Sequence, residues 1–305
     1  MKENSKPYIF NSLSELHKVL GLPNPVHPLI SIVNNSHSYI SEVNFPRSFV
    51  LNFFKIAYKP NLKSGFKYGE SYHDFEEGGL CFSSPLLPKS IEEIEDSDNA
   101  GFALFIHPDF LLGSPLASKI KQYNFFSYSV NEALHLSEKE KRSILSVIEI
   151  IGDELDGRID EFCQDIVIAQ IDLLLNYCNR FYKRQFITRK TGSNDILKKL
   201  DNLLEDYFTT EKTIEFGVPT VHYLAEQIHI TSGYLSDMLR LLIGQNAQQY
   251  IHQNIIERAK EKLVDRTLSV SEIAYELGFE HSQSFNKLFK SKTNMTPLGF
   301  RQSFN

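Results

Sequence analysis

The chain has 305 residues, of which 42% are hydrophobic, and a formal net charge of −6 at pH 7. That length favours two domains over one, and no run of 18 or more apolar residues is present to form a transmembrane helix. Cys81, Cys163 and Cys178 are widely spaced, which excludes a disulfide framework or zinc knuckle as the organising feature. The N-terminus lacks the apolar stretch of a signal peptide, so we expect a cytoplasmic protein with no membrane contact.

The first part of the chain, residues 1–130, has the pattern of a β-rich domain. The runs at 49–56 and 101–106 are rich in aromatic and β-branched residues, and Gly, Pro and Asn clusters such as 60–61, 63–65 and 77–79 separate such runs. This spacing predicts a small barrel or sandwich. Four aromatic residues are expected in its core: Phe53, Phe66, Phe82 and Phe105.

A helical pair is predicted next, over residues 136–183. Ser137 and Glu140 have the spacing of a capping box, and Ile144, Ile148 and Ile151 follow at helical spacing. A second helix, at about 160–181, is apolar on more than one face, which favours packing on the barrel, a dimer contact, or both. Residues 184–195 are polar and lack periodicity, so they are predicted to be a linker.

The last ninety or so residues contain a near-repeat. Leu224-Ala225 corresponds to Ile273-Ala274 at an offset of 49, and Leu235-Ser236 corresponds to Phe285-Asn286 at an offset of 50. One copy therefore has an extra residue in its turn. Each copy has the pattern of a short helix, a tight turn and a second helix, which points to two helix-turn-helix units and to DNA reading.

The caps and the connection complete this prediction. Thr220 and Ser232 are expected to cap the helices of the first unit and Ser271 the first helix of the second, with His281 or Ser282 beginning the last one. Gly244 and Asn294 are expected as left-handed terminators. A connecting helix over 247–264, about 27 Å long, roughly suits two recognition helices one DNA turn apart, about 34 Å. Its expected inward residues are Tyr250, Ile251, Ile255, Ala259 and Leu263.

The candidate DNA-binding residues are those that the predicted cores do not use. In the first recognition helix they are Ser232, Gly233, Ser236, Asp237 and Arg240. In the second they are His281, Ser282, Gln283, Asn286, Lys287 and Lys290. Asn and Gln can pair with adenine and Lys with guanine, whereas an Asp can accept from cytosine but repels phosphates. The basic residues are concentrated in the second unit, so we expect the two units to contribute unequally to DNA binding.

Over residues 200–303 the chain resembles the AraC/XylS family of bacterial transcription regulators. The resemblance is most specific in Ile273-Ala274-x-x-x-Gly278-Phe279, in Ser284-Phe285-Asn286-Lys287-x-Phe289-Lys290 and in Thr296-Pro297-x-x-Phe300-Arg301. It implies a tandem helix-turn-helix domain, and the segment 75–85 and the residues around His107 also resemble the cupin-like sensor barrel of that family. The chain departs from the family pattern at Asp237, Leu239, Ser284 and Asn294.

The expected fold is therefore α+β with two domains. A cupin-like β-barrel and a helical pair occupy residues 1–183 as a sensor and dimerisation domain, and an all-α domain with two helix-turn-helix units joined by a long helix occupies 196–305. A cupin metal site needs several His close to a carboxylate, but only His73 stands near Glu76 and Glu77, and His107 is far along the chain, so no metal or cofactor is expected.

We expect a non-enzymatic, sequence-specific transcriptional regulator that binds double-stranded DNA as a homodimer. A small-molecule effector of the N-terminal domain and a contact with RNA polymerase are further partners left open. Two alternatives also stay open at this point. One is a cupin-type metal enzyme with a helical tail. The other is a regulator that acts mainly through protein contacts, which the acidic total charge and Asp237 favour.

Overall fold

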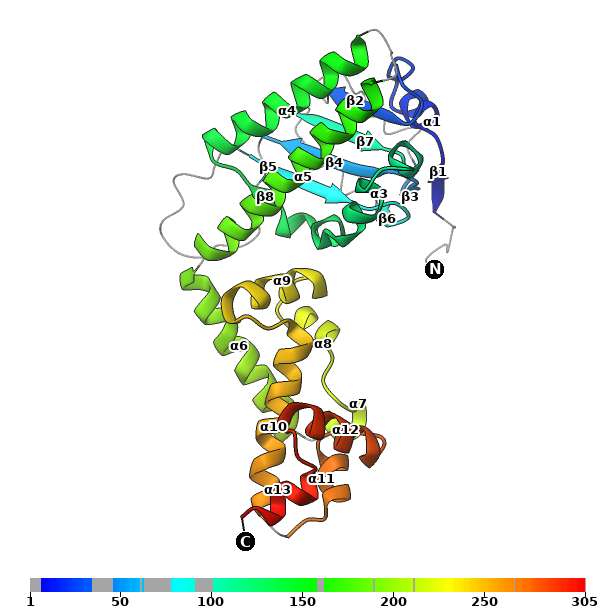
Figure 1. The fold of residues 1–305 in the computed structure, drawn as a ribbon. Coiled ribbons are helices and arrows are strands. Elements are labelled where there is room, and N and C mark those ends of the chain that lie inside the picture. Colours follow the sequence, from blue (N-terminus) through cyan, green and yellow to red (C-terminus); the bar gives the residue numbers. More distant parts are fainter. Residues whose placement is uncertain are drawn as a thin grey trace. The chain divides into compact units, whose positions relative to one another are not determined.

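The computed structural model describes residues 7–34, 46–60, 62, 78–90, 101–157, 162–188, 190–210, 212–265 and 267–304, without the side chains of 90 and 190–194. The chain divides into two compact units, Met1–Thr188 and Arg189–Asn305. The first contains the strands and the second is helical (Figure 1). The predicted residues Phe66, His73, Glu76 and Glu77 lie outside the described ranges.

Two sheets form the framework of the N-terminal unit. The larger sheet has the strand order β2-β7-β4-β5-β8 with antiparallel pairing throughout, and the smaller has the order β1-β3-β6 with β1 and β3 parallel. The strands of the larger sheet are β2 (Ile30–Asn34), β7 (Phe102–Ile106), β4 (Phe54–Lys59), β5 (Gly79–Ser83) and β8 (Leu134–His135). Those of the smaller sheet are β1 (Tyr8–Phe10), β3 (Ser48–Leu51) and β6 (Pro88–Ser90).

The β-rich prediction is confirmed in part. The described strands pair as two sheets and do not show a closed barrel. The run at 49–56 is not one strand, because β3 ends at Leu51 and β4 begins at Phe54, and the two strands belong to different sheets. Alternation within an unbroken apolar run does not reveal where a chain leaves one sheet for another.

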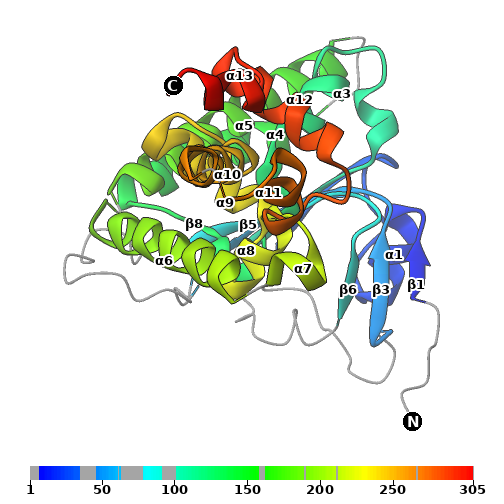
Figure 2. The ribbon, with the colours of Figure 1, turned by 90° about the horizontal axis from the view of Figure 1, so that it is seen from below.

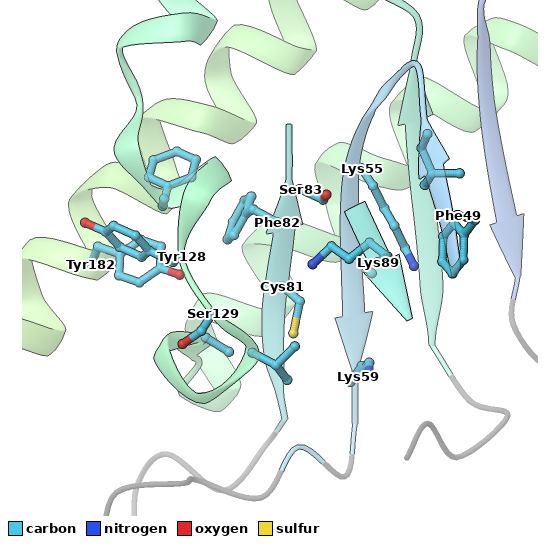
Figure 3. A pocket seen from close by; sticks show the side chains of 15 residues that line it. Phe49, Lys55, Lys59, Cys81, Phe82, Ser83, Lys89, Tyr128, Ser129 and Tyr182 are labelled. Atoms are coloured by element: carbon cyan, nitrogen blue, oxygen red, sulfur yellow. The ribbon is translucent and has the colours of Figure 1, made fainter. Parts of the chain in front are cut away.

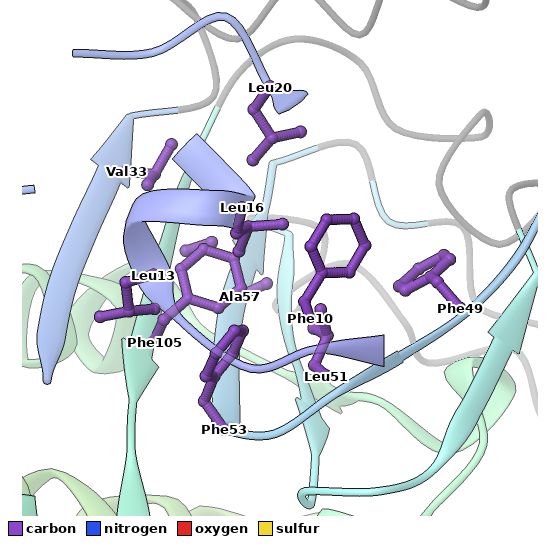
Figure 4. Packing of buried hydrophobic residues seen from close by; sticks show 11 residues of the cluster. Phe10, Leu13, Leu16, Leu20, Val33, Phe49, Leu51, Phe53, Ala57 and Phe105 are labelled. Atoms are coloured by element: carbon purple, nitrogen blue, oxygen red, sulfur yellow. The ribbon is translucent and has the colours of Figure 1, made fainter. Parts of the chain in front are cut away.

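The space between the two sheets is filled by apolar side chains. Alternate residues of β4 and β7, among them Ala57, Ala103 and Phe105, face Phe49 and Leu51 of β3 across this core (Figure 4). Helix α1 (Leu13–Val19), capped by Ser12, closes it with Leu13 and Leu16. Phe53, Phe82 and Phe105 are buried as predicted.

The opposite face of the larger sheet is covered by the helical pair α4 (Glu138–Asp156) and α5 (Cys163–Thr188) (Figure 1). The Ser137–Glu140 capping box forms as predicted, and Arg184 donates to Glu140 Oε2 at 2.7 Å. Helix α5 begins later and ends later than expected. Residues 184–188 and 190–195, predicted as an irregular linker, are helical on both sides of residue 189, since α6 begins at Lys190.

Between Ile106 and β8, short helices form the connection. They are the 3-10 turns Pro108–Leu111, Ile120–Gln122, Asn124–Ser127 and Val130–Glu132, together with α3 (Leu116–Lys119). Tyr182 and Gln185 of α5 fasten the end of this connection. Tyr182 donates to the carbonyl of Glu132, and Gln185 bonds Ala133 O and His135 N. The chain leading into β8 is therefore tied to the last turns of α5.

The C-terminal unit is built around one helix, α10 (Ala247–Val264), which contacts α8, α9, α11, α12 and α13. Figure 2 views α10 nearly along its axis, with the other helices of the unit around it. Those helices are α6 (Lys190–Thr209), α7 (Lys212–Phe216), α8 (Val221–Gln227), α9 (Ser232–Ile243), α11 (Val270–Glu276), α12 (Ser282–Thr293) and α13 (Pro297–Gln302).

Two glycines in this unit are in backbone contact. Gly278 has a φ of +90°, and a Cβ placed there would lie 2.5 Å from the carbonyl carbon of Gly217. Tyr207 of α6 donates to the Gly217 carbonyl at 3.1 Å. Gly244 also has a positive φ, +73°, but a Cβ there would meet nothing within 4 Å. These two positions separate the cost of the left-handed backbone from the cost of the close approach.

We predict that Gly278→Ala lowers the free energy of unfolding of the C-terminal unit by roughly 2–5 kcal/mol, from backbone strain plus overpacking. Gly244→Ala carries the strain alone and should cost about 1–2 kcal/mol. Urea denaturation of the full chain, followed by circular dichroism, measures both. Equal losses for the two variants would contradict the backbone contact between Gly278 and Gly217.

Candidate nucleic-acid interface

The near-repeat in the sequence is a repeat of backbone hydrogen bonds. In the first turn, the amide of Ile230 donates to Ala225 O at 2.9 Å, and in the second, Phe279 donates to Ala274 O at 3.0 Å. His229 and Gly278 take the same left-handed position. Corresponding residues of the two units are 49 positions apart up to this point and 50 positions apart from the next helix onward. The structure therefore confirms the extra residue in the second turn, at Glu280.

Both recognition helices, α9 and α12, have 12 residues and end in the same way. Gly244 has a φ of 73° and its amide donates to Arg240 O, while Asn294 has a φ of 60° and its amide donates to Lys290 O. Both terminators were predicted. Asn replaces Gly in the second unit because it tolerates the left-handed region better than other residues with a Cβ.

Two predicted N-caps are wrong. The side chain of Thr231, not Ser232, caps α9 by accepting from the Tyr234 amide at 3.3 Å. Ser269, not Ser271, caps α11 in a capping box with Glu272. Thr220 caps α8 as predicted, and Ser269 follows it at the offset of 49 that the repeat requires. At the start of α12, His281 is the N-cap residue but makes no side-chain cap bond.

The connecting helix has the predicted bounds, and its five predicted inward residues are all buried. Contacts from α6 hold its other side. Tyr250 donates its hydroxyl to Asp201, Arg258 pairs with Glu205, and the Arg258 guanidinium lies 4.7 Å from the centre of the Phe208 ring. Burial and the bond to Asp201 raise the pKa of Tyr250, so its hydroxyl stays a donor at neutral pH. The two helix-turn-helix units are therefore fixed to one rigid helix.

The candidate residues of α9 lie on the side of the helix opposite its buried residues. Tyr234, Leu235, Met238 and Leu239 form the buried side. Of the candidates, Arg240 is exposed, and Ser232, Gly233, Ser236 and Asp237 are half-buried. Arg240 donates to Asp237 Oδ1 at 2.6 Å, so the one cation of this face is neutralised by the one acid beside it.

The candidate residues of α12 present a different surface. Gln283, Asn286, Lys287 and Lys290 follow each other at helical spacing opposite the buried pair Phe285 and Phe289, and all four are exposed. His281 is exposed at the start of the helix, and Ser282 is half-buried. This face combines amide groups that can pair with adenine and ammonium groups that can pair with guanine or phosphate. It contains no acid.

The structure separates the other two basic residues of this region from that face. Lys292 lies near His252 of α10, because its charge acts with burial to lower the pKa of that histidine. Arg301 is half-buried, and its guanidinium donates to the carbonyls of Leu263 and Leu268 at 3.2 and 2.7 Å. Arg301 therefore holds the C-terminal end of α10.

Other kinds of site find little support in the described part of the chain. No group of three or more His, Cys, Asp or Glu residues there is placed to hold a metal ion. His107 caps the short helix Pro108–Leu111 by accepting from the Asp109 amide. None of the described helices combines the length and apolar character that crossing a bilayer requires.

Comparison with known proteins identifies the C-terminal region. A family model described as a helix-turn-helix domain matches residues 224–303. The HTH-type transcriptional activator RhaS of Salmonella typhimurium is 27% identical over 165 residues, 54% of each chain. The C-terminal region is therefore similar to helix-turn-helix regulators, which supports the resemblance to the AraC/XylS family. The chain aligns with about half the length of the curated relatives that it matches.

Solved structures also match. The C-terminal domain of the two-component response regulator yesN from Fusobacterium nucleatum is 30% identical, with 35% of this chain and 98% of that one aligned and a TM-score of 0.31. ToxT from Vibrio cholerae is 14% identical, with 89% of this chain and 93% of that one aligned and a TM-score of 0.30.

The pairing of Arg240 with Asp237 generates a prediction for this helix-turn-helix domain. In Asp237→Asn one negative charge is lost and Arg240 is released to contact a phosphate. We expect tighter binding to random-sequence DNA. The plot of the logarithm of the binding constant against the logarithm of salt concentration should also become steeper by about one. Fluorescence anisotropy across a salt series measures both.

Asp153→Asn, on α4 of the N-terminal unit, removes the same charge and serves as the control. A gain in both variants would assign the effect to net charge. A loss of affinity confined to the preferred DNA site in Asp237→Asn would mean that Asp237 contacts a base.

Proposed function

We propose that this protein is a sequence-specific, DNA-binding transcriptional regulator whose C-terminal domain reads two adjacent segments of double-stranded DNA. The observation behind this proposal is the pair of helix-turn-helix units joined by α10, with the two recognition helices ending in matched left-handed caps. The helix is 18 residues long, about 27 Å. That length is comparable to the roughly 34 Å between successive major grooves on one side of the duplex.

The two units have unequal parts in this proposal. The α12 face supplies most of the base reading through Gln283, Asn286 and Lys287, with Lys290 and His281 beside them. The α9 face, with Ser232, Gly233, Ser236 and the Asp237–Arg240 pair, contributes mainly shape and position. Half to two-thirds of protein–DNA hydrogen bonds go to the backbone, and small side chains allow close approach to it. Base preference should therefore be stronger in one half of the site.

The N-terminal unit is proposed to be a cupin-like sensor that responds to a small-molecule effector. Its two sheets enclose a shared core, and its last helix, α5, ends at Thr188 just before the second unit begins. An effector regulates only if it binds one arrangement of the protein better than another. We further propose that the protein works in the cytoplasm, that it contacts RNA polymerase at its promoters and that it has no enzymatic activity.

A second copy of the chain is the proposed partner of α5. Phe162, Ile166, Ala169 and Leu173 recur at the spacing of one helix face, and all four are exposed. Ile150 of α4 is also 43% exposed. Exposed apolar surface of this extent is typical of a protein contact. A homodimer would cover this stripe and would double the number of cations available to DNA.

Ile166→Glu should weaken this dimer, because it places a charge in the apolar stripe. Sedimentation velocity over a concentration series measures the change in the dissociation constant. Ile9→Glu is the control, at a residue 48% exposed on β1 of the smaller sheet, which lies on the other face of the larger sheet from α5. Identical sedimentation of the two variants and the wild type would refute the α5 interface.

The regulatory function is tested by selection from random double-stranded DNA with the full chain. We expect an enriched site in two parts, about one helical turn apart. If no site longer than a half-turn is enriched at any protein concentration, the proposal is wrong. A shallow salt dependence of binding would instead favour a regulator that acts mainly through protein contacts.

The same selection distinguishes two lysines. Lys287→Ala should relax base preference at one position of the site, at a cost of about 1–3 kcal/mol. We further propose that Lys292, which is exposed on the other side of α12, contacts a phosphate, so Lys292→Ala should weaken binding to all sequences alike and lower the salt slope by about one. Equal effects of both variants on every DNA sequence would contradict this division.

A further inference from the structure

The loop between α7 and α8 links the two helix-turn-helix units at residues outside α10. It begins at Gly217, whose amide donates to Thr213 O at 3.0 Å, and it ends at Thr220, which caps α8 of the first unit. Gly217 is also in backbone contact with Gly278 of the second turn, where an added Cβ would lie 2.7 Å from the Gly217 carbonyl oxygen. The loop that leads into the first unit therefore touches the turn of the second.

Tyr207 of α6 completes this contact. Its side chain is buried, with only 2% of its surface exposed. Its hydroxyl donates to the Gly217 carbonyl at 3.1 Å, and its ring meets the ring of Tyr223 on α8 edge to face, with centroids 4.9 Å apart. Burial and the neighbouring Tyr223 raise the pKa of Tyr207, so its hydroxyl stays a donor at neutral pH. One side chain thus contacts the first unit directly and reaches the second through Gly217.

This second link restrains a motion that α10 alone controls weakly. Burial on α10 fixes the separation of the two units along that helix, but only side-chain packing resists rotation about its axis. Helices α7 and α11 are in contact, and Figure 2 shows both on one side of α10, which is viewed there nearly along its axis. A backbone contact away from the axis resists rotation of one unit against the other, because close-packed backbone atoms cannot yield by a change of rotamer.

Rotation matters for a protein that reads two adjacent segments of the duplex. One extra base pair between two halves of a site moves the second half by about 3.4 Å along the DNA axis and by about 35° around it. Two rigidly joined units engage both halves only at the matching spacing. Loosely joined units tolerate several spacings, but they bind the best one less tightly.

We propose that Tyr207 is a positioning residue for DNA reading. It holds Gly217 against Gly278, keeps the two helix-turn-helix units at one angle to each other, and so sets the number of base pairs between the two halves of the DNA site. This inference rests on the proposed function and adds to it a residue outside the DNA-facing surface. It also makes α6, which begins at Lys190, part of the structure that reads DNA.

The first test is the affinity of the full chain for its selected site with one base pair added to or removed from the middle. The wild type should bind both altered sites about tenfold or more weakly, because the second unit is then out of register. Tyr207→Phe keeps the ring against Tyr223 but removes the bond to Gly217. It should bind the unaltered site less tightly and lose less than about threefold on either altered site.

Two results of this test would overturn the proposal. One is a Tyr207→Phe variant that discriminates among the three spacings as sharply as the wild type. The other is a wild type that binds all three spacings equally, a result that needs no variant.

The second test needs no DNA. Amide hydrogen exchange of the full chain reports on the second turn, where the amides of Gly278 and Phe279 donate to the carbonyls of Tyr275 and Ala274. Although the substitution is in α6, Tyr207→Phe should speed exchange of these two amides about fivefold or more, because the backbone contact beside the turn is loosened. Unchanged exchange there would mean that Tyr207 does not reach the second unit, and the proposal would be wrong.

Two other tyrosines provide matched controls. Tyr182 lies on α5 at the wall of a pocket in the N-terminal unit (Figure 3), and its hydroxyl also donates to a backbone carbonyl, that of Glu132, at 3.2 Å. Tyr250 donates to Asp201 of α6, a bond within the C-terminal unit that does not involve Gly217. Tyr182→Phe and Tyr250→Phe should keep the wild-type spacing preference and the wild-type exchange of the second turn. Equal changes in Tyr207→Phe and Tyr250→Phe would assign the effect to general loosening of the unit and refute a specific role of Tyr207.

Failure of the proposal can be told from failure of the proposed function. A chain that selects no two-part DNA site would refute the proposed function, and the spacing role of Tyr207 with it. A chain that selects such a site, but whose Tyr207→Phe variant keeps the spacing preference, would refute the role of Tyr207 alone.

Discussion

The C-terminal unit depends on the burial of one side of α10. Its inward residues, among them Ile251, Ile255 and Ala259, are fully buried beneath both helix-turn-helix units. A helix-turn-helix is too small to bury its own apolar side chains, so each unit completes its core on this shared helix. The same burial fixes the separation of α9 and α12, since neither recognition helix can shift along α10 without exposing apolar surface. Spacing on DNA is therefore a consequence of core packing.

The two units share their turn hydrogen bonds and their left-handed terminators, and they differ most on their outward faces, where the core places no demand. The turn hydrogen bonds and the left-handed terminators are the same in both units, because an unsatisfied amide or a strained residue is costly wherever it occurs. The outward faces have no such constraint. One became a neutralised face with an internal Asp237–Arg240 pair, and the other an exposed row of amide and ammonium groups. Positions at which the two units differ are thus informative about function, and positions at which they agree are informative about folding.

The sequence predicted this unit closely because its signals are local and repeated. The bounds of α10, its inward residues and both terminators follow from helical periodicity and from residues that tolerate a positive φ. The N-caps failed by one or two residues because Ser and Thr are plentiful near helix starts, although the offset of 49 from Thr220 leads to Ser269. The contact between Gly217 and Gly278, the internal bonds of Arg301 and the two-sheet arrangement are long-range. No local pattern encodes which strand pairs with which, so an apolar run at 49–56 concealed a change of sheet.

Position matters more than total charge throughout this chain. A net charge of −6 suggests poor affinity for any anion. Yet the outward face of α12 is a place where described cations gather without an acid. At about 8 Å, the screening length at physiological salt is shorter than the distance across a domain, so acids elsewhere on the surface scarcely cancel this local field. An acidic protein can in this way present one basic surface to a polyanion.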